Sequence, residues 1–521
     1  MDWTAGYVAD VAYTAGYFPE LNPLRIPLAL LNAGYAPPNI QNACELGFGQ
    51  GVSIAMHAAG QPSVKWFGDD FNPSHAAYAR WLADSAGVQA DLTDESFADF
   101  CSRDDLPDFD YIALHGIWSW ISDENRAIIV DFLQRKLKVG GVAYISYNTL
   151  PGWAAAMPLR DLMARHGDLM GAKGQSSFTK LDAAMAFGDK LFALQPAYLR
   201  ANEGISARFE ALKNQHKAYV AHEYLNRDWK PMYFTEIAAE LRSAKLDFAC
   251  SANLGDAVEE AHLTTEQRAF LAGIENDDFR EMIRDYIGNV QFRRDYWVKG
   301  GRQLADAERI ARIRDVRLVL VTPPDRVAKN INTALGEIAL QPAVYDPIIN
   351  LLSDFKPHSV GEIEQKVAPD VVFIQVLQAV MLLGGMNTIA VAQSDKEIAA
   401  ARPAVRKLNA AIMEQSLYSD GLAYLASPVT GGAVSASRFD QMLHLGVRAG
   451  VADYGAAADG LWDQLKAQGQ RLVKEGRTLQ TDEENLQEFR SFAKDFAHRA
   501  PTLAALGVTD APAPQSGHKR R

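Results

Sequence analysis

The segment Glu45 to Gly51, with the sequence ELGFGQG, is compatible with few folds. It follows an apolar run, Ile40 to Leu46, that predicts a β-strand, and it precedes a helical stretch through His57. Glycines at such a junction let the backbone turn tightly and approach a ligand closely. A dinucleotide-binding loop has its third glycine where this chain has Val52. The GxGxG pattern, with an acid before it, therefore favours a ligand with a positively charged amino-acid group; the alternative is a glycine turn that binds nothing.

Short apolar runs alternate with helical stretches from about Asn39 to Asn148. Further strands are predicted at Val64–Phe67, Val88–Leu92, Tyr111–Leu114 and Val142–Tyr147, with helices at Pro73–Ser85 and Asp123–Leu137. Alternating strands and helices of this length indicate parallel strands joined by right-handed crossovers. We therefore predict an α/β, doubly wound, mostly parallel Rossmann-like sheet.

The alternation stops beyond Pro151, and the 521 residues are enough for roughly three domains or more at about 100–200 residues each. Periodicity predicts mainly helical structure from Pro158 to about Ala311, for example at Arg208–Tyr219 and Thr265–Tyr286. The expected regions are a ligand-binding domain with an N-terminal helical lid (1–155), a helical domain (156–310), a winged-helix-like domain (311–400), a mainly helical C-terminal domain (401–508) and a disordered tail (509–521).

The winged-helix-like order of elements from Val344 to Val391 raises the question of DNA binding. This segment is acidic, and the candidate recognition helix, Asp370 to Leu383, contains no Arg or Lys. A recognition helix needs basic and amide groups to contact phosphates and base edges. We therefore interpret the segment as a scaffold or protein-contact domain and expect no nucleic-acid partner.

Composition narrows the class of protein further. The chain has 52 basic and 64 acidic residues, a net charge of −12, which disfavours a protein built mainly to coat nucleic acid. No run approaches the ~18 consecutive apolar residues of a membrane-spanning helix, and Met1 to Thr4 do not begin a signal peptide. Three widely spaced cysteines, Cys44, Cys101 and Cys250, suggest a reducing compartment. We expect a cytoplasmic protein without membrane insertion.

Polar and aromatic residues follow the predicted strands where a ligand would bind. Asp70 lies about 20 residues beyond the glycine loop and suits ribose hydroxyls, whereas Asp69 is the less favoured choice and could cap the next helix. Asp91 follows the third strand and could accept from an adenine amino group, or be a solvated turn residue. His115 and Trp118 follow the fourth strand and could line a substrate slot.

Several of these segments resemble a known family. Glu45 to Gly51, the Gly68-Asp69-Asp70 turn and Lys138 to Gly141 resemble class I S-adenosylmethionine-dependent methyltransferases. The segments HGIWSW (115–120), SYNTLPGW (146–153) and HEYLN (222–226) are similar to methyltransferases that carry a methyltransferase regulatory domain, a group that includes rickettsial protein lysine methyltransferases acting on an outer-membrane protein. Arg284 to Tyr286, Gln291 to Arg294 and Tyr424 to Val429 also match. Phe48 and Ile117-Trp118 depart from the usual pattern.

The resemblance implies S-adenosyl-L-methionine as cofactor and assigns residues to its site. The expected cofactor-binding residues are Tyr17, Glu45, Gly47, Phe48, Gly49, Gly51, Asp70, Phe71, Asn72, Asp91, Leu92 and His115. The expected catalytic residues are His115, Trp118, Tyr147 and Asn148, with Tyr13, Tyr17, Trp118 and Tyr147 as aromatic walls around the acceptor.

The function expected from these features is N-methylation of lysine side chains on a protein substrate by a homodimer joined through Arg208 to Lys299. A small-molecule methyltransferase that uses its extra domains as a lid, and a non-catalytic cofactor-sensing scaffold, remain as alternatives. The HEYLN segment lacks a second ligand cluster at metal spacing, so no metal site is expected and His222-Glu223-Tyr224 is interpreted as structural. No GxSxG sequence supports a serine hydrolase.

Overall fold

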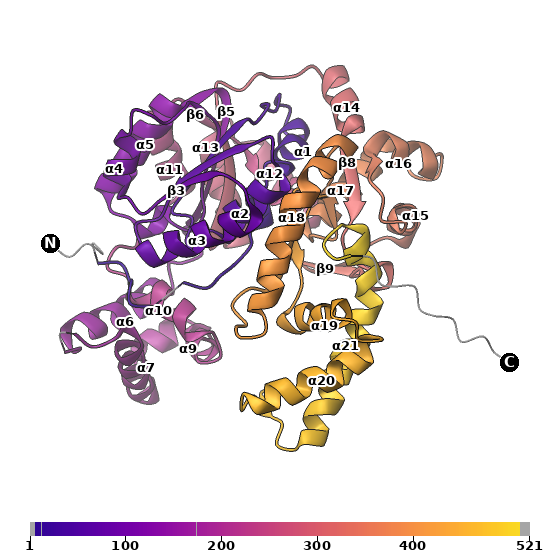
Figure 1. Ribbon diagram of the computed structural model, residues 1–521. Helices are drawn as coiled ribbons and strands as arrows, with labels where there is room; N and C mark the ends of the chain where they lie inside the picture. Colours follow the sequence, from indigo (N-terminus) through magenta and orange to yellow (C-terminus); the bar gives the residue numbers. More distant parts are fainter. Residues whose placement is uncertain (1–5, 12, 173, 511–521) are drawn as a thin grey trace.

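A seven-stranded sheet lies at the centre of the N-terminal half of the molecule (Figure 1). The computed structural model describes residues 6–11, 13–172 and 174–510. The sheet has the order β3-β2-β1-β4-β5-β7-β6, and only β7 runs antiparallel to its neighbours. Its strands are β1 (Asn42–Leu46), β2 (Lys65–Asp69), β3 (Ala90–Thr93), β4 (Phe109–Leu114), β5 (Leu137–Asn148), β6 (Leu246–Ser251) and β7 (Phe292–Lys299). The predicted doubly wound, mostly parallel fold is confirmed.

Helices cover both faces of this sheet because each contributes an apolar stripe to one of two cores. On one face pack α1 (Arg25–Asn32), α2 (Val52–Gly60) and α3 (Pro73–Ala86). On the other pack α4 (Phe97–Ser102), α5 (Asp123–Lys136) and α11 (Phe234–Arg242). The short 3-10 helices η1 (Pro19–Leu21) and η2 (Trp118–Trp120) lie beside the strand ends, and α12 (Thr265–Ala272) and α13 (Asp277–Gly288) come between β6 and β7.

The predicted boundary between residues 155 and 156 does not match this sheet. Strands β6 and β7 lie within the predicted helical domain, yet they complete the sheet beside β5. The charged sequence of β7, FRRDYWVK, does not predict a buried strand. In the structure its charges are tolerated because Arg293 and Asp295 form an ion pair inside the protein, 2.9 Å apart. The helices predicted at Arg208–Tyr219 and Thr265–Tyr286 are each divided in two by a short break.

A helical unit is inserted between β5 and β6 and has its own apolar core (Figure 1, lower left). Its helices are α6 (Met157–Leu169), α7 (Ser177–Ala193), α8 (Ala197–Ala201), α9 (Ile205–Leu212) and α10 (Lys217–Leu225). Before the sheet, residues 6–11 and 13–18 contain no helix, and the helices η1 and α1 follow them. The extended residues are held by hydrogen bonds to the α10 region.

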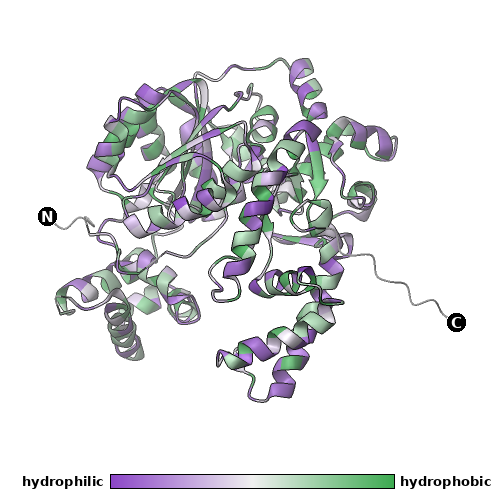
Figure 2. Cartoon of the chain, in the orientation of Figure 1, coloured by the Kyte–Doolittle hydropathy of each residue, from purple (hydrophilic) through white to green (hydrophobic). Residues whose placement is uncertain are grey.

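Beyond the sheet, a small α/β region follows the predicted order of helix, turn, helix, helix and strand. It contains α14 (Asp306–Asp315), β8 (Arg317–Leu320), η5 (Pro324–Arg326), the hairpin β9 (Asn330–Thr333) and β10 (Gly336–Ala339), α15 (Pro342–Leu352), β11 (His358–Ser359), α16 (Val360–Val367), α17 (Phe373–Gly385) and β12 (Ile389–Val391). Strands β11, β8 and β12 form a three-stranded sheet. Figure 2 shows β8 as a hydrophobic strand among helices that alternate in hydropathy.

The C-terminal region is mainly helical, as predicted. It contains α18 (Asp395–Gln415), the hairpin β13 (Tyr424–Ser427) and β14 (Gly432–Ser435), α19 (Arg438–Arg448), α20 (Tyr454–Ala467), the hairpin β15 (Val473–Lys474) and β16 (Arg477–Thr478), and α21 (Asp482–Ala505). The predicted capping box begins α21, where the Glu484 N–H donates to Thr481 Oγ1 over 3.1 Å. Helix α18 packs against α2 and α3, which fixes this region to the sheet domain. Most of the predicted disordered tail, 511–521, lies outside the described residues.

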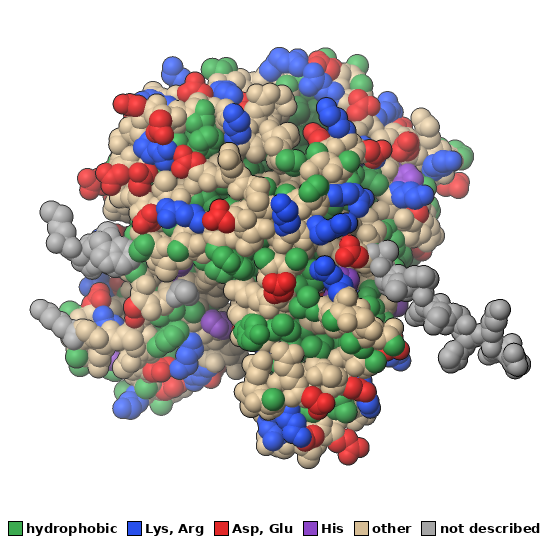
Figure 3. Space-filling model, in the orientation of Figure 1, with side chains coloured by type: hydrophobic (Ala, Val, Ile, Leu, Met, Phe, Trp, Pro, Cys, Tyr) green, Lys and Arg blue, Asp and Glu red, His purple; other side chains and the backbone are tan. Residues whose placement is uncertain are grey.

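Acidic and basic side chains are interspersed over the sheet domain on the face that Figure 3 shows. Over the part of the chain that the structure describes, no helix combines the length and the apolar character needed to cross a membrane. Because acidic and basic side chains are mixed on this face, a ligand site is located by a cavity and not by surface charge.

Candidate active site

A cavity of about 490 Å³, called the cofactor cavity below, lies at the carboxyl ends of β1, β2, β4 and β5. Open α/β sheets bind ligands at this edge, where loops between strands and helices leave space. The N-terminal segment and α10 border the cavity from the side opposite the sheet. It brings together nine of the predicted site residues, namely Tyr13, Glu45, Gly47, Phe48, Gly49, Asp70, Phe71, His115 and Asn148.

The glycine loop is shaped by three positive φ angles, 67° at Gly47, 59° at Gly49 and 68° at Gly51. A Cβ atom at Gly47 would lie 2.7 Å from the Ile117 side chain, and one at Gly51 would lie 2.3 Å from Ala79 Cβ. A Cβ atom at Gly49 would meet nothing within 4 Å. Gly47 and Gly51 are thus required by packing, whereas Gly49 keeps open space beside the cavity.

Two acids stand at the ends of the first two strands. Glu45 is buried, its Oε2 atom has no hydrogen-bond partner among the described residues, and burial, together with Asp70, raises its pKa to about 8. Asp70 is held in place because Oδ2 accepts from the Gly49 N–H (2.8 Å) and Oδ1 accepts from the Asn72 N–H (3.0 Å) and from His75 Nδ1 (3.1 Å). An unpartnered buried carboxyl beside open space is suited to a cation.

His115 lies under an aromatic cover. Its ring centroid is 3.8 Å from that of Phe18, and its Nδ1 atom is 2.8 Å from the Tyr144 hydroxyl. Burial, with a smaller effect of Arg294, lowers the pKa of His115 to about 3, so the ring is neutral at physiological pH. Nearby, the buried Nδ2 atom of Asn148 has no partner among the described residues and can donate to a bound polar group.

One face of α10 forms the opposite wall of the cavity. Tyr219, His222, Glu223 and Asn226 all line it, and they recur three or four residues apart, as one helical face requires. His222 Nε2 donates to the Val11 carbonyl over 2.9 Å, and the Val8 N–H donates to Asn226 Oδ1 over 2.8 Å. These two bonds hold the N-terminal segment beside the cavity, so His222 has a structural role and also lines the cavity.

Glu223 is the second unpartnered acid of the cavity. Burial raises its pKa to about 7 against the opposing effects of Arg160 and Arg208, and its carboxylate makes no hydrogen bond to any described side chain. Aromatic side chains surround this half of the cavity, including Tyr13, Trp120, Trp153 and Tyr219. The guanidinium carbon of Arg208 lies 4.2 Å from the centroid of the Trp153 ring.

The predicted placement of Trp118 and Tyr147 around the acceptor is wrong, because both are buried in the apolar core on one face of the sheet. Tyr147 is followed on β5 by Asn148, and successive residues of a strand face opposite sides. Asn148 therefore lines the cavity, while the Tyr147 hydroxyl donates to Asp295 Oδ2 over 2.8 Å. In the turn η2, Trp120 takes the position at the cavity that was expected for Trp118.

Five predicted cofactor-binding residues also do not line the cavity. Asn72 caps α3 through its side chain, which replaces the capping role considered for Asp69, and Gly51 is the N-cap residue of α2. Asp91 pairs with Arg103 over 2.7 Å, and Leu92 is buried in the core. Tyr17 faces a different cavity, with its hydroxyl 3.2 Å from His57 Nε2.

Other residues of the cavity were missed by sequence reasoning, notably Tyr7, Phe18, Arg208 and Glu223. The spacing of Tyr219, His222, Glu223 and Asn226 was a usable signal, since it places polar and aromatic groups on one helical face. No sequence pattern indicated that this helical face lies beside the carboxyl ends of the strands, although about 70 residues separate it from the end of β5. No group of three or more His, Cys, Asp or Glu side chains suited to a metal ion lies within the described ranges.

Comparison with known proteins shows which proteins this chain resembles. Residues 216–299 match the family model described as "Predicted methyltransferase regulatory domain". The chain is 37% identical over 518 residues to the uncharacterized protein sll1526 of Synechocystis sp., covering 98% of this chain and 100% of that protein. It is 27% identical over 295 residues to the uncharacterized protein RP789 of Rickettsia prowazekii, covering 54% and 51%. The solved structure of PKMT2 from Rickettsia typhi in complex with AdoHcy aligns with a TM-score of 0.66 at 16% identity, covering 95% of this chain and 99% of that one.

The sheet order, the glycine turn and the acids that follow the first two strands define a class I methyltransferase fold. The chain belongs to the same family as the Synechocystis protein, and it combines this fold with a segment, residues 216–299, that matches the methyltransferase regulatory domain.

Proposed function

We propose that this methyltransferase N-methylates lysine side chains of a protein, with S-adenosylmethionine as the methyl donor. The observation that supports lysine most directly is the pair of carboxyl groups, Glu45 and Glu223, on opposite walls of one cavity: Glu45 Oε2 has no hydrogen-bond partner among the described residues, and burial raises the pKa of both acids. One acid is accounted for by the amino-acid group of the cofactor. The second, among aromatic side chains, suits another alkylammonium group.

The residues present fit the cofactor. Glu45 would bind its ammonium group and Asp70 its ribose hydroxyls, and Gly49 leaves space that a larger residue would fill. The cofactor supplies an electrophilic methyl group on a sulfonium. The structure of PKMT2 in complex with AdoHcy supports this choice of donor.

Glu223 is the proposed general base. A free lysine has a pKa near 10.4, so its ammonium must lose a proton before the nitrogen can attack a methyl carbon. A carboxyl with a pKa of about 7 is half ionised at neutral pH and can take that proton. The neutral amine would then be the nucleophile for the methyl group that the bound cofactor would supply. Neutral His115, with its low pKa, is a weaker base, and we assign it and Asn148 to positioning.

Incubation of the purified chain with methyl-labelled S-adenosylmethionine and a lysate tests the acceptor. We expect label in protein, on lysine by mass spectrometry, and its loss in Glu223→Gln but not in Glu275→Gln, a control acid on the surface. Label on a metabolite, or on glutamate or glutamine, contradicts the lysine proposal and leaves the methyltransferase intact. Cofactor binding by calorimetry without any labelled product favours the scaffold alternative.

We also propose a homodimer in the cytoplasm. Phe270 and Tyr286, within the interface expected from Arg208 to Lys299, are 63% and 50% exposed. Light scattering should give the dimer mass for the parent chain and the monomer mass for Phe270→Glu, while Val139→Glu, at a site 83% exposed outside this segment, stays dimeric. Monomer mass for the parent chain at all concentrations contradicts the dimer. Free cysteines at 44, 101 and 250 support a reducing compartment.

A further inference from the structure

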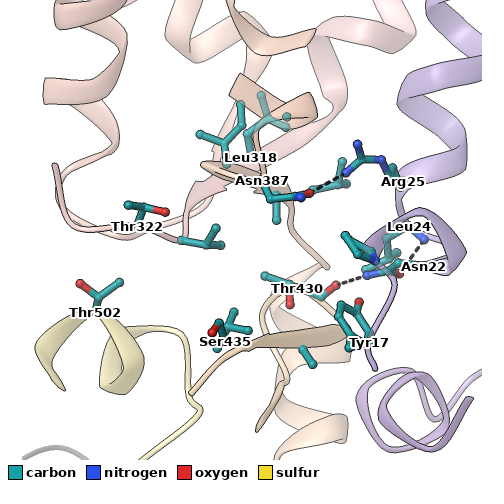
Figure 4. Close-up of a pocket in the computed structure, with 18 of the residues that line it drawn as sticks. Tyr17, Asn22, Leu24, Arg25, Leu318, Thr322, Asn387, Thr430, Ser435 and Thr502 are labelled. Atoms are coloured by element: carbon teal, nitrogen blue, oxygen red, sulfur yellow. Dashed lines mark hydrogen bonds between the residues drawn. The ribbon is translucent and has the colours of Figure 1, made fainter. Parts of the chain in front are cut away.

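A second cavity, of about 390 Å³, lies where four parts of the chain meet (Figure 4). Its walls come from residues 17–28, from β8 with the residues after it and the α17–β12 region, from the hairpin β13–β14, and from α21. Tyr17 lines this cavity, whereas its neighbours Gly16 and Phe18 line the cofactor cavity. A volume of this size suits a small organic ligand.

The charges of this second cavity are of one sign. Its described lining residues include three arginines, Arg25, Arg326 and Arg499, and no Asp, Glu, Lys or His. Arg326 is paired with Asp495, and Arg499 is 2.9 Å from Asp440. We call this space the arginine cavity.

Arg25 differs from the other two arginines because it has no carboxylate partner among the described residues. It is only 8% exposed, and its guanidinium donates to neutral acceptors, from Nε to the Ala252 carbonyl (3.2 Å) and from Nη1 to Asn387 Oδ1 (3.4 Å). Nη2 makes no hydrogen bond to any described residue. A buried guanidinium without a counter-charge is costly, and a carboxylate is the group whose geometry best satisfies it.

The other walls define the rest of the ligand. Apolar side chains predominate, among them Leu28, Leu254, Leu318 and Val321, while the hydroxyl residues Thr322 and Thr502 lie across the space from Arg25 (Figure 4). The buried hydroxyl of Thr430 has no partner among the described residues. A ligand that suits this cavity has one negative charge, which pairs with Arg25, and an apolar body, which contacts the apolar walls.

We propose that the arginine cavity binds a small amphipathic monocarboxylate, whose carboxylate pairs with Arg25 and whose apolar body contacts Leu318 and Val321. This site is separate from the cofactor and acceptor sites. Its ligand chemistry is opposite to theirs, since it selects an anion.

Calorimetric titration of the full-length chain with octanoate tests the proposal, with octan-1-ol and acetate as controls that lack the charge or the chain. We expect octanoate to bind at least about tenfold more tightly than either control, a difference of roughly 1.4 kcal/mol. Equal affinity for octan-1-ol, tighter binding of inorganic phosphate, or no binding of millimolar octanoate would each overturn the proposal.

Variants locate the site. Arg25→Gln should weaken octanoate binding at least about tenfold, whereas Arg326→Gln, which removes a charge that is already paired, should change it less than about threefold. Ser435→Trp fills the cavity from an exposed position and should also block binding, which keeps the proposal testable if Arg25→Gln does not fold. Unchanged octanoate affinity in Ser435→Trp and in folded Arg25→Gln would place the ligand elsewhere and overturn the assignment.

Discussion

The cofactor cavity and the arginine cavity are neighbours along the chain, because Gly16 and Phe18 line the first and Tyr17 lines the second. The charged side chains that distinguish the two cavities have opposite signs. The acids Glu45, whose Oε2 atom has no partner among the described residues, and Glu223 line the first, and Arg25, which has no carboxylate partner among them, lines the second. Burial without a partner costs free energy, so such a group marks a place where a ligand of the opposite charge gains the most. The contrast teaches that the kind of ligand is specified by the few charges left unpaired, since both cavities are otherwise rich in apolar side chains.

The largest effect is expected when the charge of Glu223 is removed. Glu223→Gln should lower kcat by roughly 10²–10⁴-fold, the usual contribution of a general base. Because the base must be ionised, kcat/KM of the parent chain should fall as the pH drops below about 7, and this limb should vanish in the variant. Steady-state kinetics across pH measures both effects.

Affinity for S-adenosylmethionine should stay within about threefold in Glu223→Gln, and Glu275→Gln should behave like the parent chain. A loss of cofactor affinity as large as the loss of rate would instead place Glu223 in the cofactor half of the cavity. An unchanged pH profile would exclude it as the base.

The next largest effect is expected in the cofactor half. Asp70→Ala removes a charged acceptor and should weaken S-adenosylmethionine binding by roughly 1.5–3 kcal/mol, about 10- to 150-fold. Asp91→Ala serves as the matched control, because its carboxylate pairs with Arg103 and does not line the cavity. Calorimetry that finds Asp91→Ala as damaging as Asp70→Ala would show that adenine contacts Asp91 after a rearrangement.

A smaller effect follows from the protonation of Glu45. Its pKa is about 8 without a bound cation, so the carboxyl is largely protonated at pH 7. A bound ammonium group favours the ionised form, which lowers this pKa and releases a proton on binding. Cofactor affinity should therefore rise with pH between 6 and about 7.5, by up to tenfold per unit.

Proton release can be counted directly by calorimetry in buffers with different ionisation enthalpies. The parent chain and Glu223→Gln should release nearly one proton at pH 7, and Glu45→Gln should release almost none. Equal release from all three would assign the proton to another group.

Sequence patterns were sufficient for the first half of the fold. The periodicity of residues 40–148 predicts five strands and their crossovers, because local hydrophobic patterns determine strands that are followed by their own helices. Strands β6 and β7 escaped prediction, since they join the sheet across an inserted helical unit and β7 carries charges that pair inside the protein. Local pattern does not encode such long-range neutralisation.

The same limit applies to the site. Glu45, Gly49 and Asp70 were predictable because one local turn carries them. Glu223 and Phe18 were not, because their contacts with the strand ends depend on how α10 and the N-terminal segment pack. The cavity is lined by Asn148, one strand position after Tyr147, and by Trp120, two residues after Trp118 in η2.

The smallest expected effect is a coupling between ligand binding in the two cavities. Tyr17 lines the arginine cavity, and Phe18, the next residue, packs on His115 in the cofactor cavity with ring centroids 3.8 Å apart. A carboxylate that pairs with Arg25 would order the segment from Tyr17 to Arg25 and thereby favour one position of Phe18. The cofactor would then bind to a cavity whose wall is already fixed, and less ordering would remain to oppose its binding.

We therefore expect saturating octanoate to tighten S-adenosylmethionine binding by about threefold, roughly 0.65 kcal/mol. Coupling between two binding sites is reciprocal, so saturating S-adenosylmethionine must tighten octanoate binding by the same factor, and calorimetric titration in both orders measures the two values independently. Phe18→Ala should abolish the coupling while octanoate still binds, because the variant removes the contact with His115 and leaves Arg25 in place. Octanoate binding with no change in cofactor affinity would show that the two cavities, although lined by consecutive residues, act independently.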